Sequence, residues 1–129
     1  MNPVIERAVR LEIQKPIGEL TKVDLEKITH LDLDGNQLTE LPKGLEKLTQ
    51  LTSLNLINNR LTDVNGLEKL TKLTILDLKR NQLTSVNGLE NLTKLTILDL
   101  HNNPDLTKAQ IDELQKALPN CKIHSNPTK

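Results

Sequence analysis

The chain has 129 residues, enough for one domain with a single core. It carries 17 basic and 17 acidic side chains, and the resulting net charge of zero argues against a general affinity for nucleic acid or for an anionic membrane. Phe, Tyr and Trp are absent, whereas 27 residues are Leu. We therefore expect a regular core of Leu, Ile and Val, without aromatic platforms for bases or sugars.

The single cysteine and the first residues bear on the compartment. Cys121 has no second cysteine with which to form an internal disulfide, which suits a reducing compartment. The opening letters MNPVIERAVRLE contain no long apolar run, so they are typical of neither a signal peptide nor a membrane span. The sequence leaves the compartment open and favours the cytoplasm over secretion.

Residues 1–27 are predicted to form a helical cap. Asn2, followed by a proline, is a good helix N-cap, and Pro16 is expected to close the helix that starts there. A second short helix is predicted by the letters LTKVDLEKI, where Thr21 and Asp24 can form a capping pair.

The middle of the chain, residues 28–106, repeats itself. The nine letters LTKLTILDL occur at 70–78 and again at 92–100. They belong to a longer pattern, apolar-x-x-L-x-L-x-x-N-x-L, whose copies start at Ile28, Leu51, Leu73 and Leu95. A fifth and weaker copy, LPNCKIHSN, starts at Leu118 and puts Cys121 and Ile123 at the two inner Leu positions.

Each L-x-L core alternates with a period of two, which predicts a short strand with its leucines on one face. One such strand cannot bury that face alone, but copies stacked about 4.8 Å apart pair their backbones and merge their leucines. The repeated Asn has both donor and acceptor atoms, so a column of them can satisfy the buried turns that end the strands. This predicted structural ladder consists of Asn36, Asn59, Asn81, Asn103 and Asn126.

The connecting segments are short. Residues 61–72 and 83–94 are nearly one sequence, with Asn-Gly pairs that favour turns. Because only about a dozen residues return the chain, we expect 3₁₀ or irregular pieces there. Residues 107–129 differ: Thr107 and Gln110 form a capping box, so a longer helix is predicted before the last strand.

This pattern resembles the leucine-rich repeat, and the match runs from residue 28 to residue 126. The 22-residue copies are similar to the SDS22-like subclass, which is also found in bacterial internalins, and the helical lead-in resembles the internalin cap. The resemblance implies an α/β fold, a short curved solenoid with about five parallel strands on its concave face. Residues 1–27 would cap it, residues 28–106 would form the repeats, and residues 107–129 would supply the closing helix, strand and tail.

In that family the residues flanking the two inner leucines face the concave side. Applied here, this gives a mostly acidic column beside a small strip of isoleucines, a surface suited to a protein partner with basic and apolar groups. The alternative is an unspecialised solvated face, since Ile favours strands and Asp favours solubility. The candidate binding residues are Asp32, Asn55, Ile57, Ile75, Asp77, Lys79, Ile97, Asp99 and His101.

The same surface also contains residues that could form a catalytic or a metal site. Asp77, Lys79, Asp99 and His101 can come close together, but an open sheet gives an acid–base site little shielding. Asp99, His101 and His124 are a possible ligand set without the spacing of a known metal motif. We therefore expect no catalytic residue, no metal, no cofactor and no enzyme activity.

The hypothesis that follows is a non-enzymatic, monomeric module that binds another protein of unknown identity on its concave face. Regulation of an enzyme in trans, suggested by the SDS22-like resemblance, is a special case of it. A structural or engineered scaffold without an evolved ligand is the alternative, motivated by the near identity of 61–78 and 83–100.

Overall fold

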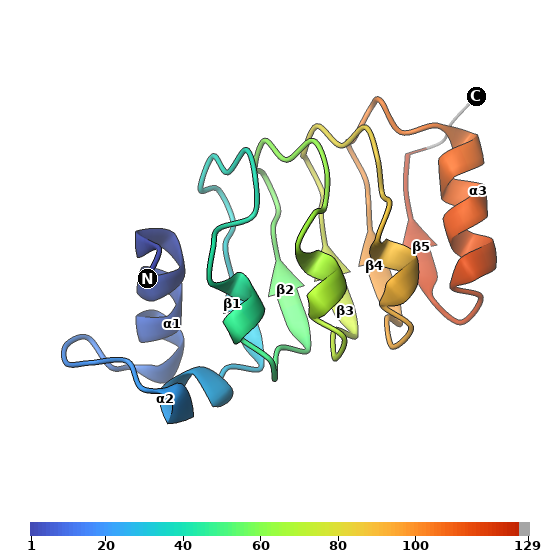
Figure 1. The fold of residues 1–129 in the computed structure, drawn as a ribbon. Helices are drawn as coiled ribbons and strands as arrows, with labels where there is room; N and C mark the ends of the chain where they lie inside the picture. Colours follow the sequence, from blue (N-terminus) through green and yellow to red (C-terminus); the bar gives the residue numbers. More distant parts are fainter. Residues whose placement is uncertain (127–129) are drawn as a thin grey trace.

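The computed structural model of the protein describes residues 1–126 and has one five-stranded parallel sheet whose strands lie side by side in chain order (Figure 1). Helices α1 (Pro3–Ile13) and α2 (Lys22–Glu26) precede the sheet, and helix α3 (Lys108–Ala117) lies between the last two strands. This confirms the predicted short solenoid. Its strands are β1 (His30–Asp32), β2 (Ser53–Asn55), β3 (Ile75–Asp77), β4 (Ile97–Asp99) and β5 (Lys122–His124).

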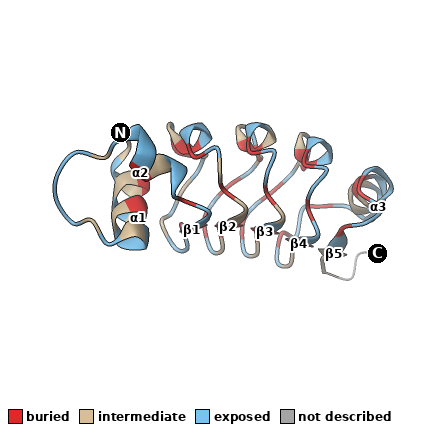
Figure 2. Ribbon diagram, turned by 90° about the horizontal axis from the view of Figure 1, so that it is seen from below, coloured by how far each residue is buried: buried red, intermediate tan, exposed pale blue. Residues whose placement is uncertain are grey.

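The opposite layer consists of three 3₁₀ turns, as predicted for the short connectors. Figure 2 shows the strands along one side, the turns along the other and the buried residues between them. The pattern leucines point into this space, and Leu33, Leu56, Leu78 and Leu98 are fully buried. The turns are η1 (Leu45–Lys47), η2 (Leu67–Lys69) and η3 (Leu89–Asn91).

A local reason explains why Gly-Leu-Glu recurs in the connectors. Gly66 starts its 3₁₀ turn with φ 104°, a conformation that side chains with a Cβ rarely adopt. Its N–H donates to Glu68 Oε2 at 2.8 Å, so the glutamate holds the start of the turn. The same bond recurs in the other two connectors.

The helices at the two ends close the core. Ile5 and Val9 of α1 are fully buried, and this helix packs against β1. Leu114 of α3 and Leu118 just after it are buried at the other end. The ends are thereby covered by elements that the interior repeats do not have.

The caps predicted for the helices are present. Asn2 Oδ1 accepts from the N–H groups of Val4 and Ile5 at 2.8 and 3.4 Å. Helix α1 ends earlier than Pro16, because Gln14 adopts a left-handed conformation with φ 56°. The capping boxes of α2 (Thr21, Asp24) and of α3 are both complete.

The register of the last strand differs from the prediction. The repeat pattern aligned Cys121 with Leu98, but Ile123 is the residue that pairs with Leu98. The physical reason is α3, a helix of ten residues in place of a three-residue 3₁₀ turn, which uses more chain before β5 begins. Lys122 and His124 consequently pair with Ile97 and Asp99, two residues away from their predicted partners.

Candidate functional site on the concave face

The strand register brings the candidate residues into rows across the concave face. Ile75 pairs with Ile97, and Asp77 pairs with Asp99, on neighbouring strands β3 and β4. Ile75 and Ile97 are 41% and 42% exposed, whereas the leucines between the rows are buried. Two adjacent, half-open aliphatic side chains thus lie in the middle of the sheet.

The Asp or Asn that ends each of the first four strands has a structural role that was not predicted from the sequence. Asp77 Oδ1 accepts the backbone N–H of Lys79 at 3.1 Å, and Asn55, on the neighbouring strand, accepts that of Ile57 at 2.8 Å. Asp32 and Asp99 make the same bond to the residue two places later. An acceptor at the end of each strand is therefore needed for the turn, and Asp or Asn can supply it. This role could have been recognised in the sequence, because the same position is Asp or Asn in four repeats.

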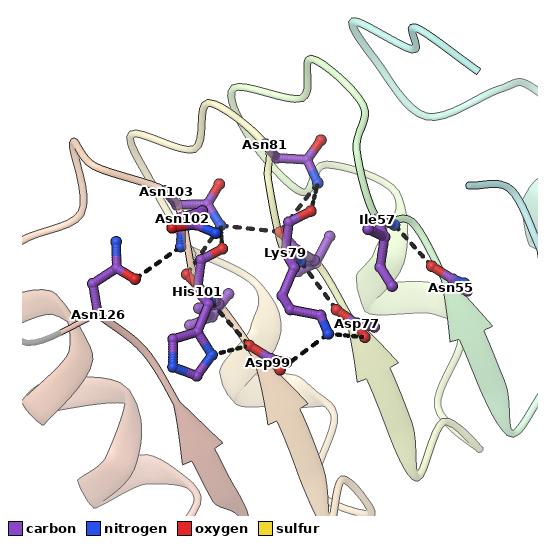
Figure 3. A network of polar contacts seen from close by, with 12 residues as sticks. Asn55, Ile57, Asp77, Lys79, Asn81, Asp99, His101, Asn102, Asn103 and Asn126 are labelled. Atoms are coloured by element: carbon purple, nitrogen blue, oxygen red, sulfur yellow. Dashed lines mark hydrogen bonds and ion pairs between the residues drawn. The ribbon is translucent and has the colours of Figure 1, made fainter. Parts of the chain in front are cut away.

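One lysine and one imidazole lie among the carboxylates of β3 and β4 (Figure 3). Lys79 Nζ is 3.6 Å from Asp77 Oδ2 and 3.9 Å from Asp99 Oδ2. His101 Nδ1 is 2.7 Å from Asp99 Oδ1. Lys79 thus offsets part of the negative charge here, and the surface is less negative than the column of Asp residues suggests.

The two ends of the face differ in charge. At the β1 end, the exposed carboxylates of Asp32 and Asp34 have no ion-pair partner within residues 1–126. At the β5 end, the rings of His101 and His124 stack with centroids 6.1 Å apart and planes at 27°. The face therefore runs from free carboxylates, across the isoleucines, to a pair of imidazoles.

Beside this face runs the ladder of asparagines, of which Asn59, Asn81 and Asn103 are 4–5% exposed. Asn81 Oδ1 accepts from the N–H of Leu61 at 3.1 Å. Its Nδ2 donates to the carbonyls of Leu56 at 2.9 Å and Leu78 at 3.1 Å. One side chain thus satisfies groups in two consecutive turns, which fixes the stacking of the strands.

The two outermost asparagines of the predicted ladder make different hydrogen bonds from the interior ones. Asn36 is half-buried and donates to the carbonyl of Asp34 at 3.3 Å, since no strand lies before β1 to offer a second turn. Asn126 Oδ1 accepts from the N–H of Asn102 at 3.0 Å, where the interior repeats use a backbone carbonyl. The shifted register of β5 accounts for this substitution of side chain for backbone.

Three further findings concern metal ligands, the single cysteine and membrane spans. Among residues 1–126 no group of three or more His, Cys, Asp or Glu side chains is placed to hold a metal ion. Cys121 is buried, and burial raises the pKa of its thiol. No helix in the described part of the chain is long and apolar enough to cross a membrane.

Comparison with known proteins gives the family. The model for leucine-rich repeats matches residues 26–69 and 71–120. The chain is a leucine-rich repeat protein. An uncharacterised leucine-rich repeat-containing protein of Schizosaccharomyces pombe is 46% identical over 48 residues, which are 37% of this chain and 8% of that protein.

Solved structures of bacterial leucine-rich repeat proteins superpose on most of the chain. Internalin C2 of Listeria monocytogenes has a TM-score of 0.78 and 28% identity over 95% of this chain and 53% of its own. A leucine-rich repeat protein of Leptospira interrogans has a TM-score of 0.69 and 33% identity over 83% of this chain and 28% of its own. The chain is thus internalin-like and spans about half the length of the internalin. Proteins of this kind are typically non-enzymatic interaction modules.

Proposed function

We propose that this leucine-rich repeat protein binds another protein on the concave face of its sheet, without catalysing a reaction. The fold is generally a protein-interaction module. The observation that carries the proposal is the pair Ile75 and Ile97, whose side chains are 41% and 42% exposed beside each other at the centre of the face. Apolar side chains exposed together among polar ones are typical of interaction sites.

The charges around this pair indicate the chemistry of the partner. Lys79 offsets one of the two negative charges of Asp77 and Asp99, which favours an apolar contact at the centre over a strongly basic one. Asp32 and Asp34 are free to meet a basic group at the β1 end. The matching partner presents an aliphatic or aromatic side chain with a Lys or Arg on one side of it.

The repeats themselves supply the variants for the test. Ser53 occupies the row of Ile75 and Ile97 on strand β2, so the double change Ile75→Ser/Ile97→Ser uses a residue that this position accepts. Asn91 is the counterpart of Lys69 in the next connector, so Lys69→Asn is a matched control on the convex side. Both proteins are expected to melt close to the wild type.

The three proteins serve as baits for affinity capture from a lysate of the source organism and from a lysate of its host, with mass spectrometry and then titration of the captured partner. We expect a partner that binds the wild type and Lys69→Asn alike and is lost by Ile75→Ser/Ile97→Ser. Equal binding by the double variant would move the site away from the concave face. Capture of no specific partner would favour a scaffold without an evolved ligand.

A further inference from the structure

A second feature lies outside the concave face, along the edge where the strands turn over. A shallow groove of about 610 Å³ runs there over the buried amides of Asn59 and Asn81. We call it the ladder-edge groove. Its lining is wholly polar apart from one glycine, and it contains two arginines but no acidic residue. The lining residues besides the two ladder asparagines are Gly35, Gln37, Asn58, Arg60, Arg80, Gln82 and Asn102.

Comparison of the repeats separates what the fold needs here from what it does not. Directly after the ladder asparagine, two repeats have Gln37 and Gln82, and the repeat between them has Arg60. Directly before it, two repeats have Asn58 and Asn102, and the repeat between them has Arg80. In adjacent repeats a neutral amide residue is thus replaced by an arginine, and both arginines line the same groove.

The backbone gives a second and independent observation. Arg80 has φ 58°, in the left-handed region that Gly and Asn adopt most readily. The equivalent residues in the neighbouring repeats are Asn58 and Asn102, with φ 60° in both. Arginine at this position costs stability that asparagine would not, so local structure does not explain its presence. No hydrogen bond or ion pair within residues 1–126 holds the guanidinium of Arg60 or of Arg80.

We propose that the ladder-edge groove binds an acidic glycan, an oligosaccharide that carries carboxylate or sulfate groups. The two guanidiniums of Arg60 and Arg80 match such groups through paired N–H donors. The surrounding amides of Gln37, Asn58 and Gln82 both donate and accept, which suits the hydroxyls of a sugar. A peptide is a poorer match, because it usually binds through apolar contacts and this lining has no apolar side chain. A nucleic acid is also a poorer match, because its binding relies on aromatic stacking and a basic excess, and the chain has neither.

The groove is open, so weak binding is expected and solution NMR is the appropriate method. The ¹⁵N-labelled protein is titrated with a heparin-derived hexasaccharide, with an oligogalacturonate of the same length and with uncharged maltohexaose. One or both acidic sugars are expected to shift the amide signals of Arg60, Arg80 and Gln82 and the Arg Nε signals. Maltohexaose is expected to shift none, and added salt is expected to weaken the binding.

The decisive variant is Arg60→Gln/Arg80→Asn, which gives both positions the residue of their neighbouring repeats. We expect its dissociation constant to rise at least about tenfold, since both charge-assisted contacts are lost. Its melting temperature should rise as well, because Asn fits the left-handed position. Lys94→Gln, at an exposed cation outside the groove, removes one charge and is expected to bind like the wild type.

Three results would overturn the proposal. The first is the absence of any shift with either acidic sugar at millimolar concentration. The second is unchanged binding by Arg60→Gln/Arg80→Asn. The third is tighter binding, at the same residues, of a phosphorylated peptide or a single-stranded oligonucleotide of equal charge, which would assign the groove to another class of ligand. None of these results bears on the concave face, so the proposed function is tested separately.

Discussion

The interior repeats and the two ends of the solenoid are stabilised in different ways. Inside, the same few contacts recur: leucines that stack, a buried Asn such as Asn81 that joins two turns, and a glutamate that holds each 3₁₀ turn. At the ends the contacts differ from those of the interior repeats, such as the Lys15–Asp24 ion pair and the capping box at Thr107. The repeated contacts stabilise a repeat fully only where it has a neighbouring repeat on both sides. Each end of the solenoid therefore needs other contacts to cover its core.

The same contrast separates structure from function in this chain. Where a repeat keeps the common residue, the fold accounts for it, as with the Asp or Asn that ends each of the first four strands. Where one repeat departs from its neighbours without a structural reason, as at Arg60 and Arg80, the departure points to a ligand. The repeats thereby serve as internal controls for one another.

The largest difference between interior and end is predicted at the ladder. Asn81→Ala should lower the free energy of unfolding by about 3 kcal/mol, because it leaves buried backbone groups of two turns without partners. Asn36→Ala should lower it by about 0.5 kcal/mol, since this half-buried side chain makes one bond within its own turn. Urea unfolding of both variants measures the difference. Equal losses would mean that the interior ladder is no stronger than its end.

A smaller effect is predicted at the cap of α3. Thr107 Oγ1 accepts from the N–H of Gln110 at 3.2 Å, and the Gln110 side chain accepts from the N–H of Thr107 at 2.8 Å. Thr107→Ala should lower the free energy of unfolding by about 1 kcal/mol, whereas Thr107→Ser should leave it almost unchanged. Thermal unfolding of the two variants tests this, and a loss in the Ser variant equal to that of Ala would show that the hydroxyl is not the stabilising group.

The smallest effect is predicted for the charge pair of the N-terminal cap. The hydrogen bond from Lys15, with a further one from the N–H of Thr21, lowers the pKa of Asp24 from 3.8 to about 2. A carboxyl whose pKa is lower in the folded state stabilises it fully above its unfolded pKa and loses this effect as the pH falls through the folded pKa. The stability difference between wild type and Asp24→Asn should therefore shrink between about pH 4 and pH 2. Melting curves across this range check it, and a difference independent of pH would contradict the role of the ion pair.

Most of the fold could be predicted because the pattern residues act locally and alike. Each L-x-L segment forms a strand wherever it recurs, and the Asn that follows needs only a neighbouring turn. The register of β5 could not be predicted by counting, because the length of α3 changes how many residues separate Leu98 from its partner, Ile123. For the same reason Asn126 does not take the ladder position in which the repeat pattern placed it.

The candidate site was predictable in its members and not in its electrostatics. The alternation of the strands placed Ile75, Asp77 and their neighbours on one face. The sequence did not predict that Lys79 lies between two carboxylates, because a long side chain can reach several different partners in the folded structure. They also gave no sign of the stacking of His101 on His124, which depends on the shifted register.

The isoleucine pair of the concave face is the contact that we propose for a protein partner. The chain has nine isoleucines, and their methyl groups report on different surfaces in one NMR spectrum. On addition of the captured partner, the signals of Ile75 and Ile97 should shift or broaden, while those of Ile17 in the N-terminal cap and Ile111 in α3 should stay in place. Shifts confined to Ile17 or Ile111, with Ile75 and Ile97 unmoved, would contradict the account.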